Sequence, residues 1–282
     1  MIFDIHTHWF APEIAGGAEA WAAASAEAHF GTVMGRGTLQ SFPSIGEFLR
    51  AMDDAQAERA AIQGWYFKNS KNCRAWNRSA AQAIKKHSDR LCAFAAVNCA
   101  EKDFEEVLDE ACSMGFKGVG ELHDGVQGFD FLSENFGRLC AVCAERKMPV
   151  SLHLSDPRGK DYPNKVLTQN ARAYEAARRN KNTKFIFAHF GGGDVFLENF
   201  SLPENVYLDC AANTFLYGAE AYKNLPDEIL SKIAFGSDYS LRLYPRRHKV
   251  AEMRDFAEES AAAMPKKFSQ KFFRGNFESL VF

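Results

Sequence analysis

The stretch IFDIHTH, residues 2–8, opens the chain with apolar residues interleaved with polar ones. In an extended strand every second side chain lies on the same face, so Asp4, His6 and His8 share one face. Three polar side chains on a strand that otherwise reads as buried must satisfy one another or meet a charged group. The stretch therefore predicts a buried strand with a polar face that needs a partner.

Seven more short, apolar, β-rich runs follow, and helical patterns separate them. One helix is expected from Ser44, where Glu47 completes a capping box, and another is expected to end on Gly115 as its C-cap. Strand–helix alternation repeated eight times predicts a parallel sheet, and eight units over 282 residues fit a (β/α)8 TIM barrel. A doubly wound open sheet is the alternative, but no glycine-rich phosphate loop follows the first strand. We expect strands near residues 2–8, 60–65, 91–97, 116–121, 149–154, 184–189, 205–210 and 232–238.

The segment 9–43 is rich in alanine and glycine and is too long for a simple turn. We interpret it as an insertion over the mouth of the barrel. No composition shift or low-complexity stretch marks a second domain, so residues 1–282 are predicted to form a single α/β barrel domain.

Composition limits the partners of the chain. Lys+Arg 34 against Asp+Glu 36 gives a net charge of −2 without long runs of either sign, which argues against a nucleic-acid or membrane-surface partner. No stretch approaches the roughly 20 apolar residues of a membrane helix. The seven cysteines are odd in number and scattered, as in a reduced cytoplasmic protein. We expect a small-molecule substrate as partner, a cytoplasmic location, no nucleic acid and no membrane, and we leave a homo-oligomer open.

Polar residues also close three later strands: His153 ends VSLHL, His189 ends FIFAH and Asp238 ends AFGSD. In a barrel of this type the C-terminal strand ends form the active-site face, so these residues should converge with His6 and His8. Imidazoles and a carboxylate around one point favour a divalent transition metal, with zinc first among the candidates. A single strand-end histidine is more often a satisfied polar group, but five such residues at equivalent positions favour the metal site.

This combination resembles the amidohydrolase superfamily of metal-dependent hydrolases. The resemblance covers nearly the whole chain and is strongest to the branch of small, single-barrel proteins. That branch also includes aminocarboxymuconate-semialdehyde-type decarboxylases and sugar or pyrone lactonases. AHFGGG at 188–193 is similar to its histidine-glycine turn after strand 6, and FFRGNFESLVF at 272–282 is similar to its C-terminal ending.

The resemblance implies roles for the matched positions. His6 and His8 would bind the metal, and His153 would be a further ligand. Asp238 would be a ligand and the base that takes a proton from the metal-bound water. His189 would bind a second metal or, with one metal, hydrogen-bond the substrate or the water. The expected cofactor is therefore one or two divalent ions per chain, zinc being the first choice.

Strand 4 decides how many ions bind. Many two-metal relatives carry a carboxylated lysine there, but Lys117 lies four residues before Glu121, ~13 Å deeper at ~3.3 Å per residue. Glu121 resembles the bridging glutamate of other two-metal branches, although a supporting acid that binds no metal is an equal alternative. His123 is expected in the following loop, and Asp4 is expected to support the ligands rather than bind metal.

These features predict a metal-dependent hydrolase of a small-molecule ester, lactone or amide. The alternative is a metal-dependent non-oxidative decarboxylase that acts on a small carboxylated ring compound, and a metal-binding protein without catalysis is a third reading. Candidate pocket residues for an anionic or hydroxylated ring come from three loops: Trp65, Tyr66, Lys68, Arg158, Lys160, Tyr162 and Arg242.

Overall fold

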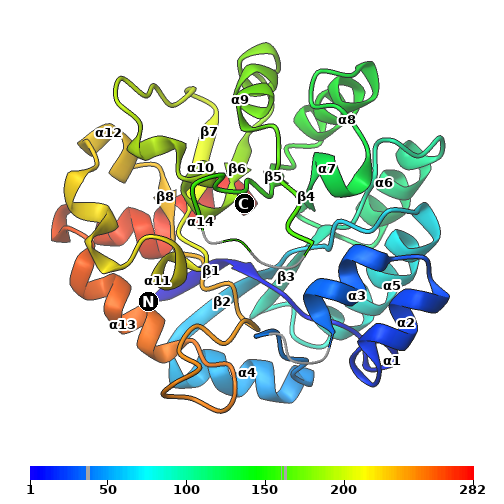
Figure 1. Ribbon diagram of the computed structural model, residues 1–282, viewed down its shortest axis with the longest axis horizontal. Helices are drawn as coiled ribbons and strands as arrows, with labels where there is room; N and C mark the ends of the chain where they lie inside the picture. Colours follow the sequence, from blue (N-terminus) through cyan, green and yellow to red (C-terminus); the bar gives the residue numbers. More distant parts are fainter. Residues whose placement is uncertain (36–38, 160, 162–163) are drawn as a thin grey trace.

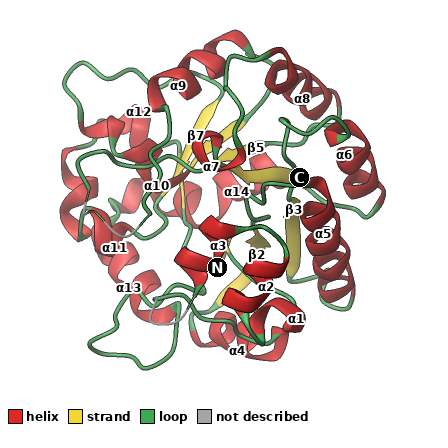
Figure 2. Cartoon of the chain, turned by 45° about the vertical axis from the view of Figure 1, so that its right-hand side comes forward, coloured by secondary structure: helices red, strands yellow, loops and turns green. Residues whose placement is uncertain are grey.

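Eight parallel strands form a barrel surrounded by helices (Figures 1 and 2). The computed structural model describes residues 1–35, 39–159, 161 and 164–282. Each strand pairs in parallel with the next one along the chain. The strands are β1 (Ile2–Thr7), β2 (Ala57–Ile62), β3 (Leu91–Ala95), β4 (Gly118–Leu122), β5 (Val150–Leu152), β6 (Phe185–Phe187), β7 (Val206–Asp209) and β8 (Ile233–Ala234).

The last strand returns to the first. The backbone N–H of Ile5 donates to the carbonyl of Phe235 at 2.8 Å, and a parallel bridge joins Thr7 to Tyr239. An open doubly wound sheet would leave both edge strands unpaired. The predicted (β/α)8 barrel is therefore confirmed, and the doubly wound alternative is wrong.

All eight strands exist, but most are shorter than the sequence pattern indicates. The strand expected at 60–65 is β2, which begins at Ala57 and ends at Ile62. The strand expected at 232–238 pairs only over Ile233–Ala234. Several polar residues therefore follow the paired segments rather than lying within them, among them His153, His189 and Asp238.

Helices fill the connections between the strands and cover the outside of the barrel (Figure 2). The expected capping box is present, because Ser44 accepts from the N–H of Glu47 while the Glu47 side chain accepts from Ser44. Gly115 follows its helix with φ of 87°, as expected for a helix-ending glycine. The longer helices are α4 (Ile45–Asp54), α5 (Ser70–Lys85), α6 (Phe104–Ser113), α8 (Glu134–Glu145), α9 (Asn170–Arg179), α13 (Arg254–Ala263) and α14 (Asn276–Val281).

Short helices lie mainly in the loops. Among them is a π-helical turn at Lys271–Gly275. The others are α7 (Asp124–Gln127), α10 (Ala188–Gly192), α11 (Asn213–Leu216), α12 (Asp227–Leu230) and the 3-10 turns Asp194–Phe196, Ala219–Asn224 and Lys266–Phe268.

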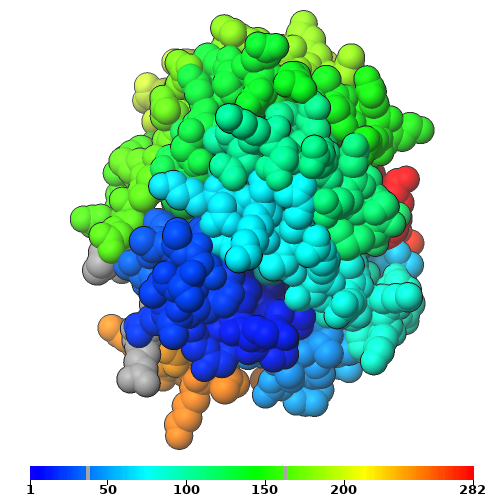
Figure 3. Space-filling model, turned by 90° about the vertical axis from the view of Figure 1, so that its right-hand side faces the viewer, coloured from blue at the N-terminus to red at the C-terminus, as the bar shows by residue number. Residues whose placement is uncertain are grey.

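The insertion after β1 folds into three short helices, α1 (Pro12–Ala15), α2 (Ala18–Ala24) and α3 (Ala28–Met34). Figure 3 shows this blue segment packed against the cyan segment that includes α5. The buried Glu27 side chain accepts from the N–H of Lys68 at 2.9 Å and from the Asn72 amide at 2.7 Å. Residues of the insertion line the cavity at the mouth, so the predicted position of the insertion is confirmed.

The opposite end of the barrel is apolar. Ile5, Phe94 and Ile186, from non-adjacent strands, form one buried cluster with Phe277 and Leu280 of α14. Burying these side chains closes the N-terminal end and leaves the C-terminal end for polar residues. Among the described residues, the structure has no helix long and apolar enough to cross a membrane.

Candidate metal centre

The structure brings all six predicted site residues to the C-terminal end of the barrel. They stand in or after five different strands: His6 and His8 at β1, Glu121 in β4, His153 after β5, His189 after β6 and Asp238 after β8. Their donor atoms divide into two groups of three, the β1–β8 group (His6, His8 and Asp238) and the β4–β6 group (Glu121, His153 and His189).

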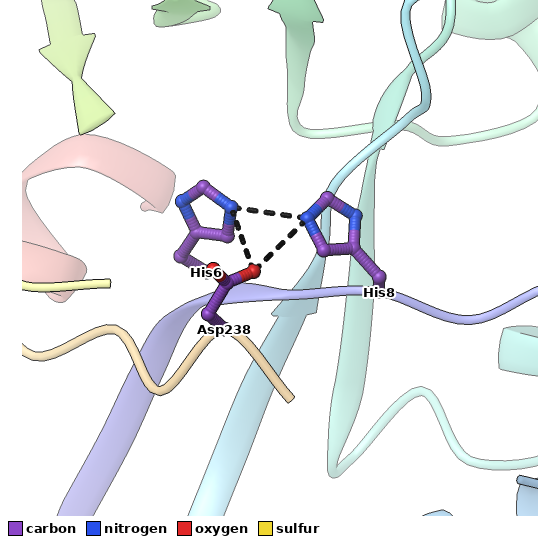
Figure 4. A group of neighbouring side chains, drawn as sticks. All are labelled: His6, His8 and Asp238. Atoms are coloured by element: carbon purple, nitrogen blue, oxygen red, sulfur yellow. Dashed lines mark hydrogen bonds and ion pairs between the residues drawn. The ribbon is translucent and has the colours of Figure 1, made fainter. Parts of the chain in front are cut away.

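In the β1–β8 group three donor atoms face one another (Figure 4). The two Nε2 atoms of His6 and His8 are 3.2 Å apart, and Asp238 Oδ1 lies 3.4 Å from His8 Nε2 and 3.8 Å from His6 Nε2. All three residues are buried. Two imidazole nitrogens and one carboxylate oxygen, converging on one point away from water, are a donor set that suits zinc and similar ions.

The β4–β6 group repeats the same set of donors. His153 Nδ1 lies 2.9 Å from Glu121 Oε1, and His189 Nε2 lies 3.4 Å from His153 Nδ1 and 3.8 Å from Glu121 Oε1. The second group is therefore also two imidazole nitrogens and one carboxylate oxygen.

Glu121 joins the two groups. Its Oε1 faces His153 and His189, while its Oε2 lies 3.7 Å from His6 Nε2 and 3.8 Å from His8 Nε2. One buried carboxylate thus presents one oxygen to each group. The residues fit a pair of divalent cations that share Glu121.

The electrostatics of the cluster match a cation site. Burial opposes the charge of Glu121, but the neighbouring imidazoles of His153 and His6 outweigh it and hold its pKa well below the usual range. Burial likewise opposes the charge of Asp238, yet its bond to His8 and its proximity to His6 lower its pKa. Both carboxylates are ionised at neutral pH and are available as ligands.

The pKa of His6 is shifted in the opposite direction, upward. Burial alone would favour the neutral ring, but the negative charges of Asp209 and Glu121 raise the pKa of His6 to about 10. The cluster therefore attracts positive charge strongly, and in the absence of a metal ion a proton on His6 supplies it.

Asp209, at the end of β7, supports two of the predicted ligands, and the sequence analysis missed it. Its Oδ2 lies 2.8 Å from His6 Nδ1, and its Oδ1 accepts from the backbone N–H of His189 at 2.9 Å. A hydrogen on His6 Nδ1 leaves Nε2 as the free donor atom. The signal was present, because Asp209 closes an apolar strand just as Asp238 does.

Two other polar residues support the cluster. Asp4 Oδ1 accepts from the backbone N–H groups of His6 and Ser237, each at 3.1 Å, and so lies behind the ligands as expected. His123, which was expected in a loop, caps α7 and stacks on His153 with ring centroids 5.1 Å apart and an interplanar angle of 9°. Burial lowers the pKa of His123, so a neutral ring packs against His153.

The turn after β6 directs His189 toward the cluster. Residues 189–193 are all left-handed, with φ between 55° and 74°. A Cβ on Gly192 would lie 2.4 Å from the Asn170 side chain, so only glycine fits there. Asp238 is also left-handed, with φ of 60°. Left-handed backbone therefore occurs at two of the six positions, as is common at functional sites.

A cavity of about 580 Å³ opens above the cluster. Of the seven candidate pocket residues, Trp65 and Tyr66 line it, and their rings stack at 4.4 Å. Lys68, Arg158 and Arg242 do not line it, because their side chains lie elsewhere on the loops. Lys160 and Tyr162 lie outside the described residues. Lys117 is exposed just before β4 and takes no part in the cluster, as expected.

Comparisons with known proteins agree with this arrangement. A family model described as amidohydrolase matches residues 3–280. The chain belongs to the amidohydrolase family. No curated protein sequence matches it significantly.

Solved structures similar to this amidohydrolase chain share its fold over nearly their whole length. An uncharacterised TIM-barrel protein from Bordetella bronchiseptica is 17% identical, with 99% of this chain and 97% of that chain covered and a TM-score of 0.69. A 2,6-dihydroxybenzoate decarboxylase is 16% identical, with 99% and 98% covered and a TM-score of 0.69. A probable 2-pyrone-4,6-dicarboxylic acid hydrolase from Acinetobacter baumannii is 14% identical, with 99% and 98% covered and a TM-score of 0.64.

Proposed function

We propose that this protein is a metal-dependent hydrolase that cleaves a small-molecule ester, lactone or amide with the aid of two divalent ions. The observation that carries the proposal is the position of Glu121, whose two oxygens face two separate groups of ligand atoms. His6, His8, Asp238 and one Glu121 oxygen would hold the first ion. The other Glu121 oxygen, His153 and His189 would hold the second. A mixture of imidazole nitrogens and carboxylate oxygens favours zinc.

The tautomer of His189 supports its role as a ligand rather than as a group that hydrogen-bonds the substrate. Its Nδ1 lies 3.0 Å from the carbonyl oxygen of Ala211 and donates to it, because a carbonyl only accepts. Its Nε2 is then an unprotonated donor atom directed at the β4–β6 group. The second ion therefore has two imidazoles available.

Divalent ions held by these residues would supply a water of lowered pKa and would polarise the scissile carbonyl. Asp238 is buried beside His8 and also lines the cavity, so its carboxylate meets both the water and the substrate. It takes the proton as the water oxygen bonds to the carbonyl carbon, and it passes that proton to the leaving oxygen or nitrogen as the old bond breaks.

The decarboxylase alternative uses the same ligands, and three of the similar structures are decarboxylases. That likeness concerns the fold alone. The negative charge of the Glu121 carboxylate beside the ions favours bound water and disfavours a substrate carboxylate, because like charges repel. This argument supports the hydrolase.

The two reactions differ in where atoms from solvent appear. Candidate esters, lactones and carboxylated rings are incubated with zinc-loaded protein in ¹⁸O-labelled water, and the products are weighed by mass spectrometry. Hydrolysis puts one labelled oxygen into the product acid. Release of carbon dioxide without label in the organic product would replace the hydrolase by the decarboxylase.

The two-ion arrangement has its own test. Glu121→Gln keeps the size of the side chain and removes the charge that both ions would share. We expect bound zinc, measured by elemental analysis, to fall from about two ions per chain to one or fewer. Glu145→Gln, on the outer helix α8, is the matched control and should leave the zinc content unchanged.

A further inference from the structure

The walls of the cavity above the cluster are mainly apolar and come from every side of the mouth. The insertion contributes Val33 and Leu39, and the loop after β2 contributes Trp65. The remaining large apolar side chains belong to loops after β5, β7 and β8: Leu154, Phe215, Leu216 and Leu241.

The described side chains that line the cavity supply little positive charge for an anionic ligand. Among the lining residues that the structure describes, Lys165 is the one cation, and its ammonium donates to the carbonyls of Asp156 and Gly159 at 3.1 and 3.3 Å. Arg158 lies nearby but pairs with Asp156 and with the carbonyl of Gly193. The Asp156 carboxylate itself adds negative charge to the wall.

We propose that the substrate is an uncharged ester, lactone or amide with an aryl or alkyl body. This inference rests on the proposed function and names its substrate class. The apolar body packs against the walls, while the scissile carbonyl reaches the cluster. A carboxylate on that body would lose its hydration against the apolar walls without gaining an ion pair.

The first test compares matched substrates. Zinc-loaded protein is given 4-methylphenyl acetate and 4-carboxyphenyl acetate, which differ in one methyl-to-carboxylate change. We expect kcat/KM for the neutral ester to exceed that for the anionic ester by roughly tenfold or more, since a buried unpaired carboxylate costs several kcal/mol. Rates are corrected for the uncatalysed hydrolysis of each ester.

A binding measurement does not depend on catalysis. Calorimetry with 4-methylacetanilide and 4-acetamidobenzoate, in zinc-loaded and in ion-free protein, should show tighter binding of the neutral amide in both. Equal binding, preference for the benzoate or no binding of either amide would overturn the inference. Preferential binding of the neutral amide without turnover of any ester would overturn the proposed function and leave the substrate class standing.

A substitution at the rim of the cavity tests whether the lack of a cation there causes the preference for neutral esters. Leu216 is 39% exposed and lines the cavity, so Leu216→Arg adds a cation where an anionic ligand would lie. We expect the ratio of neutral to anionic kcat/KM to fall by roughly fivefold, the effect of a partly exposed charge pair. Leu197→Arg, at a position that is 49% exposed and outside the cavity lining, is the matched control. Leu241→Lys replaces Leu216→Arg if that variant does not fold, and an unchanged ratio in the folded variant would contradict the inference.

Discussion

The two ligand groups have the same chemistry but are held in different ways. The β1–β8 group lies on a strand and on the segment that pairs with it: the N–H of Asp238 donates to the carbonyl of His6 at 2.9 Å. In the β4–β6 group Glu121 lies in β4, but both histidines lie beyond paired strands, His153 after β5 and His189 in a left-handed turn. The His6 side chain is 0% exposed, whereas the His153 side chain is 17% exposed.

This difference suggests that the two groups bind their ions with different affinities and lie at different distances from the substrate. A ligand set that includes the fully buried His6 and is held by backbone pairing between its two segments keeps its geometry, and it should bind its ion tightly. A set that depends on loops and opens to the cavity should exchange its ion more readily and lie closer to the substrate. Four predictions test this contrast, from the largest expected effect to the smallest.

The largest effect is expected when each group loses one histidine. His6→Ala should remove most of the metal and lower activity roughly a thousandfold, because several kcal/mol of transition-state stabilisation by the ions is lost. His153→Ala should keep about one ion per chain. Elemental analysis and kinetics on both variants make the comparison, with the peripheral His87→Ala as control. Equal metal loss in the two variants would show that the two groups do not differ in how tightly they bind their ions.

The next effect concerns Asp238, the one member of the β1–β8 group that we expect to transfer a proton. Asp238→Asn should keep much of the metal while kcat falls by roughly a hundredfold or more, the usual loss for a general base. Asp89→Asn, at an exposed position outside the cluster, is the control. Full activity in Asp238→Asn would remove this residue from the mechanism. Loss of metal as well would mean that its role as a ligand dominates.

Substitution of Asp209 tests whether this residue holds His6 of the β1–β8 group in place. Asp209→Asn weakens the hold on His6 and the bond to the His189 backbone, so zinc affinity should fall roughly thirtyfold, within the range for residues that orient ligands. Competition with a fluorescent chelator measures the affinity. Circular dichroism shows whether the variant still folds. An affinity equal to that of the unchanged protein would mean that the strand alone holds His6.

The smallest effect is expected for a change of one pH unit. The pKa of His6 is raised to about 10 without metal, so His6 carries a proton at neutral pH that zinc must displace. Zinc binding to the β1–β8 group should release about one proton, and affinity should rise roughly tenfold per pH unit between about pH 6 and 9. Calorimetry in buffers of different ionisation enthalpy counts the protons. The pKa of His189 is lowered by burial and by His153, so His189 should release none. Affinity that does not change with pH would contradict the assignment of His6 as a ligand.

Much of the fold could be predicted because it depends on local patterns. Short apolar runs alternate with capped helices, and the barrel follows from their number and order. The predicted ends of the strands were less accurate, as in β2 and β8. The reason is that apolar residues such as Trp65 continue past the last hydrogen bond between the strands. A hydrophobic pattern reports burial, and here the cavity wall buries residues as effectively as the barrel does.

The contacts of the site were harder to predict. His6 and Asp209 are 203 residues apart, and no spacing rule connects them. The stacking of His123 on His153 depends on where the loop after β4 turns. The prediction that loop cations line the pocket was wrong in part for the same reason. Lys68 and Arg242 do not line the cavity, because the paths of their loops cannot be read from a linear pattern.

The order of residues along the chain was enough to predict the barrel, the six polar residues at its C-terminal end and the kind of ion that those residues suit. These properties follow from residue type and from position along each strand, which a linear pattern records. Only the tertiary structure decided that Glu121 presents one oxygen to each ligand group, that Asp209 orients His6, and that apolar side chains surround the cavity. Those properties depend on distances between atoms from strands far apart in the chain, and packing of the whole barrel sets such distances.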